Sequence, residues 1–425
     1  MLKRLLIASL LIAVLAVPLV LYAQEDGLPE LILAARAGYH PEGIDWDAGR
    51  GVFVTGSLTE GGVFTVAGDG TVTQLAPGVE GLSSTGVHVD AERNRVLVAM
   101  PDFTAAQNPE SSGAAALGAY DLETGEELFF VNMTDLHEGR DFANDVTVDA
   151  EGNAYVTTSF SGVLYRVDTE GNAEIFLEAD DFAVEGFGLN GIDYHPEGNF
   201  LLVAVAGSGA IYKVPVDDPA GYTQVTLDAP VSIDGMVLGD DGMLYAVASV
   251  GGAQTREVVT LASEDEWASA SVVSQQATQA DLSPTTLALV DGAAYVVHAK
   301  FSSIGSDPPV ESFEIQRFAF DDAPAEGGET TLSGEELVNT RCTVCHTRER
   351  IDNAEKTEAD WAETVDRMIG HGAVLNEAER AAVIAYLAGT DSASGSSTDE
   401  SAGSGDDSGG GDDSGGGEDV DDIEY

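Results

Sequence analysis

The chain has 425 residues, and its 74 acidic residues against 18 Lys and Arg give a formal net charge of −56. This length predicts two or three domains. The acidic excess argues against a nucleic-acid partner, because binding to phosphates requires a basic face. It is typical of a protein that repels its own copies, or of one adapted to salt.

The first 23 residues are expected to direct export. Lys3 and Arg4 are followed by an almost uninterrupted apolar run, Leu5 to Ala23. Cleavage after Ala23 predicts a mature exported protein. The alternative is an uncleaved N-terminal anchor, since about 20 apolar residues span a bilayer, and only that case makes the membrane a partner. Both predict a periplasmic or extracellular location.

Residues 25–320 show β-type patterning with an internal repeat. One phrase recurs six times: a polar residue, a small or polar residue, alternating apolar positions and a turn. The copies begin at Glu42, Thr85, Asn144, Asn190, Asp234 and Thr285, between 43 and 59 residues apart. Six units of four short strands predict a mainly β fold, a six-bladed β-propeller. The widest interval is expected to hold an extended loop from Ala105 to Gly118.

The polar residues that head the copies are expected to converge. Equivalent positions of radially arranged blades meet at one mouth of the central channel. Two carboxylates, two carboxamides and two hydroxyls there would form an oxygen-rich ring, which suits a hard divalent cation. The alternative is that Asn and Asp before a strand merely form turns.

The phrases Pro41-Glu42-Gly43, Leu189-Asn190-Gly191 and Ile233-Asp234-Gly235 resemble those of the SMP-30/gluconolactonase-like family. The resemblance implies that Glu42, Asn190 and Asp234 bind a divalent cation, calcium or zinc, with Asn144 beside it. It also implies sugar-lactone hydrolysis, in which Asp234 would act as general base. The basic substrate-binding residues of some lactonases have no identifiable match.

A second site lies in residues 332–390, after a Pro/Glu/Gly-rich linker at 321–331. Cys342-Thr343-Val344-Cys345-His346 contains the only two cysteines of the chain. This C-x-x-C-H spacing predicts covalent haem c attachment, with His346 as an axial ligand of the iron. A structural zinc site would need four ligands and a fourth is not evident. A redox dithiol is the other alternative.

Helices are expected to enclose this motif. A capping box at Thr357 and Asp360 predicts a helix ending near Gly370, and another is predicted from Asn376 to Gly389. The segment is similar to the short single-haem cytochrome c domains attached to exported bacterial proteins. The sixth iron ligand is predicted to be Met368, and His371 or an open position are the alternatives.

The remaining residues, 391–425, form an acidic Ser/Gly/Asp tail that composition predicts to be disordered. The sequence thus leaves three functions open. The first is an electron-transfer protein whose metal-binding propeller holds a small organic substrate and whose haem serves a redox partner protein. The second is a metal-dependent lactonase with an accessory haem. The third is a non-catalytic propeller that positions a cytochrome.

Overall fold

The computed structural model describes residues 27–108, 110–184, 186–279, 282–320, 334–338, 348–352, 354, 356–369 and 377–389. The chain divides into two compact units, Met1–Phe320 and Asp321–Tyr425. No helix within the described ranges is long and apolar enough to cross a membrane. The predicted export segment, the linker and the acidic tail lie outside the described residues.

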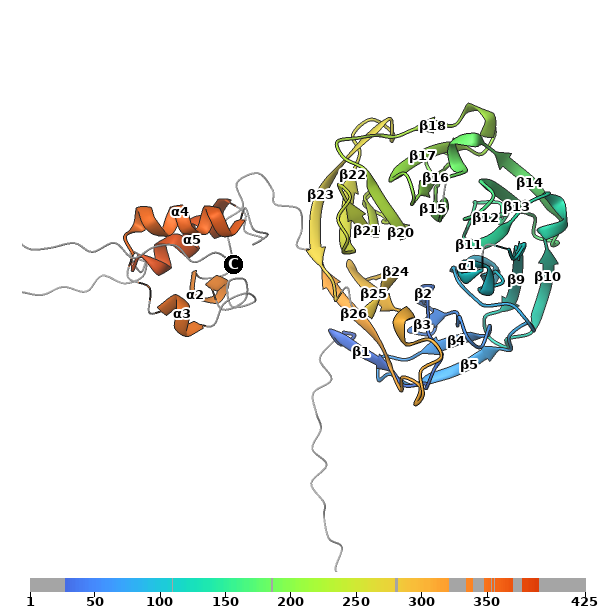
Figure 1. The fold of residues 1–425 in the computed structure, drawn as a ribbon, viewed down its shortest axis with the longest axis horizontal. Helices are drawn as coiled ribbons and strands as arrows, with labels where there is room; N and C mark the ends of the chain where they lie inside the picture. The colour runs from blue at the N-terminus through green and yellow to red at the C-terminus, as the bar shows by residue number, and fades with distance from the viewer. Residues whose placement is uncertain are drawn as a thin grey trace, which may run out of the picture. The chain divides into compact units, whose positions relative to one another are not determined.

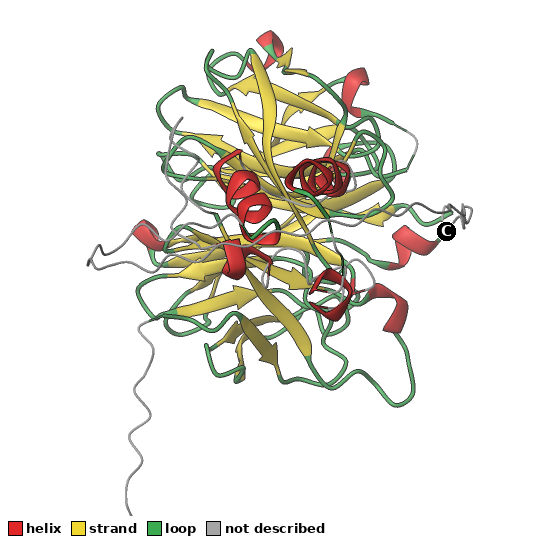
Figure 2. Cartoon of the chain, turned by 90° about the vertical axis from the view of Figure 1, so that its left-hand side faces the viewer, coloured by secondary structure: helices red, strands yellow, loops and turns green. Residues whose placement is uncertain are grey.

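The first unit is a six-bladed β-propeller, which confirms the predicted fold class (Figure 1). Each blade contains four antiparallel strands, and the third and fifth blades each have one short parallel strand in addition. The edge-on view of Figure 2 shows the twist of the blades. The innermost strands surround the channel. They are β2 (Ile44–Asp47), β6 (Val87–Asp90), β11 (Asp141–Val148), β15 (Leu189–His195), β20 (Val231–Leu238) and β24 (Pro284–Val290).

The other strands complete the blades in chain order. In the first three blades they are β3 (Val52–Thr55), β4 (Val63–Val66), β5 (Val72–Ala76), β7 (Arg95–Met100), β9 (Ala116–Asp121), β10 (Glu127–Asn132), β12 (Ala154–Thr158), β13 (Val163–Val167) and β14 (Ala173–Glu178). In the last three they are β16 (Phe200–Val205), β17 (Ala210–Pro215), β18 (Thr223–Gln224), β21 (Leu244–Val250), β22 (Glu257–Ala262), β23 (Ser269–Ala277), β25 (Ala293–His298) and β26 (Phe313–Ala319). Short 3₁₀ helices occupy Ala91–Arg93, Thr134–Leu136, Asp180–Phe182, Pro219–Gly221 and Phe301–Ser303.

The ring is closed by the N-terminal strand of the unit. Strand β1 (Leu31–Ala34) pairs antiparallel with β26, the last strand of the unit, so the sixth blade contains both ends. Arg317 adds an ion pair to Glu30 beside this junction. This pairing joins the two ends of the unit and covers the edge of β26.

Apolar side chains pack between neighbouring blades. On β16 every residue is buried, and successive side chains point to opposite faces of the sheet. Leu201 and Val203 pack with Tyr155 of the preceding blade, whereas Leu202 and Ala204 pack with the following blade. Because both faces are covered, the strand is a continuous apolar run.

The inner strands have a feature that the repeat did not predict. Asn144, Asn190, Asp234 and Thr285 were expected just before a strand, but each lies inside one. The pairing register shifts across each of them, between Ala143 and Val146 in β11 and at equivalent places in β15, β20 and β24. Such β-bulges add a residue and re-aim its side chain, which is how a strand residue can project into the channel mouth.

The expected loop from Ala105 to Gly118 is only partly a loop. It contains α1 (Thr104–Gln107) and β8 (Gly113–Ala114), and its last residues already belong to β9. Strand β8 pairs in parallel with β11 and so extends the third blade. Strand β19 (Thr226–Leu227) extends the fifth blade in the same way, beside β23. The expected extended loop is therefore interrupted, because part of its backbone pairs with β11.

The second unit is helical. It contains α2 (Gly334–Leu337), α3 (Arg348–Asp352), α4 (Glu358–Ile369) and α5 (Glu377–Leu387). Leu337, Trp361, Val365 and Ile384 are buried in its core. The predicted capping box before α4 is present, because the Thr357 N–H donates to Asp360 Oδ2 at 3.1 Å and the Asp360 N–H donates to Thr357 Oγ1 at 3.3 Å.

Candidate functional site

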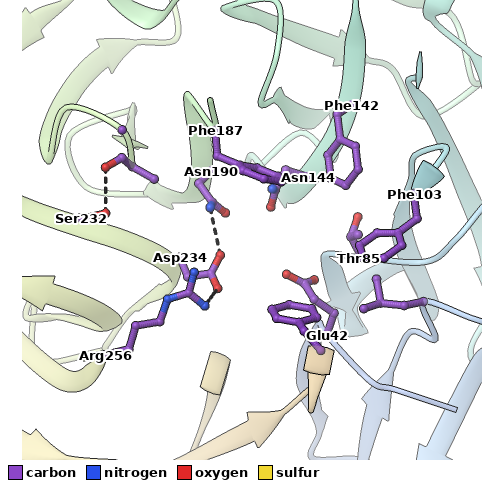
Figure 3. Close-up of a pocket in the computed structure, with 14 residues that line it drawn as sticks. Glu42, Thr85, Phe103, Phe142, Asn144, Phe187, Asn190, Ser232, Asp234 and Arg256 are labelled. Carbon is purple, nitrogen blue, oxygen red and sulfur yellow. Dashed lines mark hydrogen bonds and ion pairs between the residues drawn. The ribbon is translucent and has the colours of Figure 1, made fainter. Parts of the chain in front are cut away.

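The channel mouth holds a pocket of about 290 Å³. Of the six residues that head the sequence repeats, all but Thr285 line it (Figure 3). Glu42, Asn190, Asp234 and Asn144, the residues of the predicted cation site, therefore face one cavity. They come from four different blades, so closure of the ring brings them together.

The two hydroxyl residues of the repeat hold blades together. Thr285 Oγ1 donates to the Glu42 carbonyl oxygen at 2.6 Å. Thr85 Oγ1 lies 3.1 Å from the Ala143 carbonyl oxygen and 3.2 Å from that of Ala99. Each hydroxyl is thus hydrogen-bonded to a backbone carbonyl oxygen of a neighbouring blade.

Asp234 forms an ion pair that the sequence did not predict. Asn190 Nδ2 donates to its Oδ1 at 2.9 Å, and the Arg256 guanidinium donates to its Oδ2. Arg256, which directly precedes β22, also donates to the Pro284 carbonyl oxygen at 2.9 Å. Burial raises the pKa of the Asp234 carboxyl, while Arg256 and the Asn190 amide oppose the shift.

Glu42 is in the opposite situation. Within the described part of the chain, its carboxylate accepts no hydrogen bond and forms no ion pair. Burial raises its pKa well above the ordinary value, and the nearby carboxylates of Asp234 and Asp145 raise it further. Figure 3 shows the Glu42 carboxylate directed into the pocket. The surroundings of Glu42 therefore favour the protonated, uncharged form of its carboxyl.

The Asn144 amide is fixed by its neighbours. Its Nδ2 donates to Ser159 Oγ at 2.9 Å, and Ser159 in turn donates to the Leu189 carbonyl oxygen at 2.8 Å. With the amide nitrogen held by this chain of hydrogen bonds, its Oδ1 remains as the acceptor for a ligand.

Aromatic residues form the walls above this polar floor. Phe103, Phe142, Phe187 and Phe301 line the pocket together with Leu58. The Phe142 and Phe187 rings meet edge to face with centroids 5.7 Å apart. An apolar wall with a few polar groups at the base is typical of a small-molecule site.

A second ring of acidic residues lies further along the channel. Asp45, His88, Asp145 and Asp193 line a cavity of about 70 Å³. Asp45 accepts the Val89 N–H at 2.7 Å, and Asp193 accepts the Leu238 N–H at 2.6 Å. Burial raises the pKa of Asp145 to about 8, and it also raises those of Asp45 and Asp193.

The donor types of the predicted cation site suit a divalent ion, and two of its side chains, Asp234 and Asn190, are hydrogen-bonded to each other in this structure. Both Asp234 oxygens already accept N–H donors, and Asn190 presents its amide nitrogen to that carboxylate. Among the described residues, no group of three or more His, Cys, Asp or Glu could hold a metal ion. An ion at Asp234 would have to displace Arg256 and reverse the Asn190 amide.

Sequence reasoning missed Arg256 and the aromatic wall. Arg256 follows a Gly- and Ala-containing turn outside the repeated phrase, and nothing in the local pattern marks it. For two of the wall residues a signal existed, since Phe142 and Phe187 precede Asn144 and Asn190 by two and three residues. A sequence signal also existed for the second ring of acidic residues, because Asp45 and Asp193 occupy the same position in the repeat.

Of the predicted haem ligands, only Met368 lies among the residues that the structure describes. Met368 lies on α4 and is half-buried. Cys342, Cys345, His346 and His371 lie outside the described residues, so the choice between Met368 and His371 stays a prediction.

Comparison with solved structures supports the propeller. The chain is 18% identical to the major allergen Mala s 1 of Malassezia sympodialis, covering 71% of this chain and 99% of that one at a TM-score of 0.59. A luciferin-regenerating enzyme matches at 12% identity, covering 69% and 98%, with a TM-score of 0.48. A gluconolactonase of Xanthomonas campestris matches at 14% identity, covering 68% and 89%, with a TM-score of 0.46. Likeness at these identities concerns the fold alone.

No curated protein matches the chain. Residues 332–405 match the family model of the haem-binding domain of the quinohemoprotein amine dehydrogenase alpha subunit. This segment includes the C-x-x-C-H motif and helices α2 to α5. The chain therefore combines a six-bladed β-propeller with a haem-binding domain.

Proposed function

We propose that the protein is an exported electron-transfer protein with covalently attached haem c, whose propeller binds a small organic substrate. The observation that carries this proposal is the match of residues 332–405 to a haem-binding family around the Cys342-x-x-Cys345-His346 motif. A haem of this type supplies one-electron transfer. A periplasmic or extracellular redox protein would be its partner, with membrane attachment only if the N-terminal segment is retained.

Within the haem unit, the chain would contribute attachment and ligation. Cys342 and Cys345 would form thioether bonds with the haem, and His346 would supply one axial nitrogen. Met368 on α4 is the proposed second ligand, because it is the only methionine of residues 332–390. A thioether ligand raises the reduction potential relative to a second histidine.

Haem content is the direct test. The protein is produced in a host that matures c-type cytochromes, and a pyridine haemochrome assay is performed on the purified chain. We expect one covalently bound haem per chain and reversible reduction by dithionite. A chain that folds and is exported without covalent haem would overturn the proposal.

Ligand variants identify the sixth ligand. Met368→Ala should abolish the weak sulfur-to-iron charge-transfer band of the oxidised protein and lower its reduction potential. His371→Ala serves as the control. The opposite pattern would assign His371, and unchanged spectra in both variants would assign an open position.

For the propeller, the proposal rests on the shape of the pocket. The aromatic walls would exclude water and contact the apolar part of a ligand, while Glu42 and Asn144 would orient its polar part. A propeller that only positions the cytochrome would bind no small molecule here.

A second candidate is a divalent-cation-dependent lactonase. It is favoured by the fact that Glu42, Asn190 and Asp234 line one pocket, with Asp234 as the candidate general base. The Arg256–Asp234 ion pair opposes it. Arg256→Met should increase the affinity for calcium or zinc, measured by calorimetry, if this ion pair blocks a cation site. Lactone hydrolysis that requires the cation and disappears in Asp234→Asn would establish this function.

A further inference from the structure

The two carboxamides of the pocket direct their nitrogen atoms toward protein groups. Asn190 Nδ2 donates to Asp234 Oδ1 at 2.9 Å (Figure 3), and Asn144 Nδ2 donates to Ser159 Oγ at 2.9 Å. These contacts fix which end of each amide is nitrogen, because a carboxylate oxygen accepts and the Ser159 hydroxyl already donates to the Leu189 carbonyl oxygen. Within the part of the chain that the structure describes, neither Oδ1 atom accepts a hydrogen bond. Both carboxamides therefore offer a free acceptor oxygen to a ligand.

The hydroxyl groups of the lining follow the same pattern. Ser232 Oγ donates to the Ala206 carbonyl oxygen at 2.8 Å, and Thr85 Oγ1 donates to the Ala143 carbonyl oxygen at 3.1 Å. A hydroxyl that donates in this way retains only its lone pairs for a ligand. The neutral polar side chains of the pocket are therefore rich in acceptors.

A hydroxyl group is the ligand group that matches this lining. It can donate its proton to an amide oxygen, and its own oxygen can accept from the Arg256 guanidinium or from the Glu42 carboxyl when protonated. A carbonyl or ether oxygen only accepts, so such a ligand would leave the oxygens of Asn144 and Asn190 without a partner. Burying an acceptor without a partner costs free energy, and a site built to bind a hydroxyl therefore rejects analogues that lack it.

The walls suit an aromatic body. Phe103, Phe142, Phe187 and Phe301 line the cavity, and its volume of about 290 Å³ is at the small end for a ligand pocket. The Phe187 and Phe301 side chains are 40% and 36% exposed, so they keep ring surface free for a ligand. Aromatic rings prefer tilted or edge-to-face contacts with other rings, as Phe142 and Phe187 already make. A ligand ring can therefore extend this aromatic cluster.

We propose that this pocket binds a small aromatic compound through a hydroxyl group, an aromatic alcohol or a phenol. The hydroxyl would donate to Asn144 Oδ1, which belongs to the same strand, β11, as the wall residue Phe142. The ring would lie against Phe187 and Phe301. The assignment rests on the proposed function of the pocket as a small-molecule site and names the class of molecule.

Three probes test the hydroxyl and the ring separately. Calorimetry on the full-length haem-loaded protein, in EDTA to remove divalent cations, compares 2-phenylethanol with its methyl ether and with 2-cyclohexylethanol. We expect 2-phenylethanol to bind one per chain. The ether, which lacks the donor, should bind at least about tenfold more weakly, and 2-cyclohexylethanol about threefold more weakly.

Variants assign the binding to the named groups. Asn144→Leu removes the acceptor and should weaken 2-phenylethanol by at least about tenfold, with little effect on the ether. Ser159→Ala releases the Asn144 amide and should reduce the preference for the alcohol over the ether, a change that a merely structural role would not produce. Asn132→Leu, at an exposed position of β10, is the matched control and should change neither affinity. Phe187→Leu should reduce the preference for phenyl over cyclohexyl. Thermal unfolding verifies that each variant is folded.

The outcomes separate this inference from the proposed function. Equal binding of the alcohol and its ether, or unchanged alcohol affinity in folded Asn144→Leu, would overturn the hydroxyl assignment and leave a small-molecule site in place. Equal or tighter binding of 2-cyclohexylethanol would overturn the aromatic part. Binding of none of the three probes would overturn the inference as a whole. Haem content and reduction, measured on the same sample, test the electron-transfer proposal independently.

Discussion

The two candidate sites of this protein are built in opposite ways. The haem attachment motif is five consecutive residues, Cys342 to His346, whereas the pocket residues extend from Glu42 to Phe301 along the chain. A motif of consecutive residues specifies its chemistry locally, and the surrounding fold needs only to leave room for the haem. The pocket exists only when the inner strands close into a ring, so its chemistry depends on every blade.

The two sites should also respond differently to amino-acid substitution. A substitution in the motif removes one covalent bond or ligand and leaves the propeller core intact. A substitution at a bulge moves a pocket side chain and strains the contact between two blades. The following predictions separate these two kinds of dependence.

The largest effect is expected for the paired substitution Cys342→Ala and Cys345→Ala. Without thiols no thioether bond can form, so haem stain on a denaturing gel should disappear completely. The propeller should unfold at an unchanged temperature in calorimetry, because the two units have separate hydrophobic cores. Retained covalent haem would show that attachment does not depend on the motif.

Next in size is Gly235→Ala, at the bulge beside Asp234. A Cβ atom at Gly235 would lie 1.8 Å from Thr286 Oγ1 on the neighbouring inner strand, so the two blades would have to separate. We expect the free energy of unfolding of the propeller to fall by about 1–3 kcal/mol, measured by denaturant titration. Haem content should not change.

Two variants control this prediction. Gly49→Ala, at an exposed turn where the nearest atom would be 3.3 Å away, should have little effect. Combining Gly235→Ala with Thr286→Gly should restore part of the loss, because the crowded side chain is removed. Full stability of Gly235→Ala alone would mean that the close contact between the blades is not maintained in solution.

A smaller effect concerns pH and the inner ring of the channel. Because Asp45, Asp145 and Asp193 have raised pKa values, the folded chain holds their protons more tightly than the unfolded chain. Their contribution to stability is therefore fully present below about pH 4 and is lost as the pH rises through the folded pKa values. For Asp145 this loss extends to about pH 8.

Asp193→Asn tests the pH dependence. Asp193 faces His88 and accepts hydrogen bonds from Leu238 N–H, Tyr194 N–H and Thr147 Oγ1. The variant should show a smaller decrease in melting temperature between about pH 5 and about pH 8.5 than the parent, even where its absolute stability is lower. Glu80→Gln is the control with an exposed carboxyl. An equal decrease in all three proteins would locate the pH dependence elsewhere.

The smallest effect is expected for Thr357→Ala at the start of α4. Loss of the capping hydroxyl should destabilise the haem unit by about 1 kcal/mol and leave the propeller unaffected. Unfolding of the two units is followed separately, by the haem absorption band and by far-ultraviolet circular dichroism. Thr357→Ser, which retains the hydroxyl, should behave like the parent.

Much of the architecture could be predicted because its signals are local or periodic. The spacing of the six sequence repeats predicted the positions of all six inner strands. The Thr357–Asp360 pair predicted the start of α4. The repeat did not reveal the bulges, because a shift in pairing register depends on the neighbouring strand. It placed Asn144, Asn190 and Asp234 at one end of the channel but could not give their hydrogen-bond partners.

What the sequence determined by itself is therefore the number of blades and the haem motif, since each is encoded by spacing along the chain. Only the tertiary structure decided which carboxylate of the pocket is neutralised. Arg256, which precedes β22, reaches Asp234 on β20 of the same blade. No cationic side chain forms an ion pair with Glu42 among the described residues. Charge pairing of this kind depends on distances in space, so two carboxylates that look equivalent in the repeat acquire different chemistry once the blades fold.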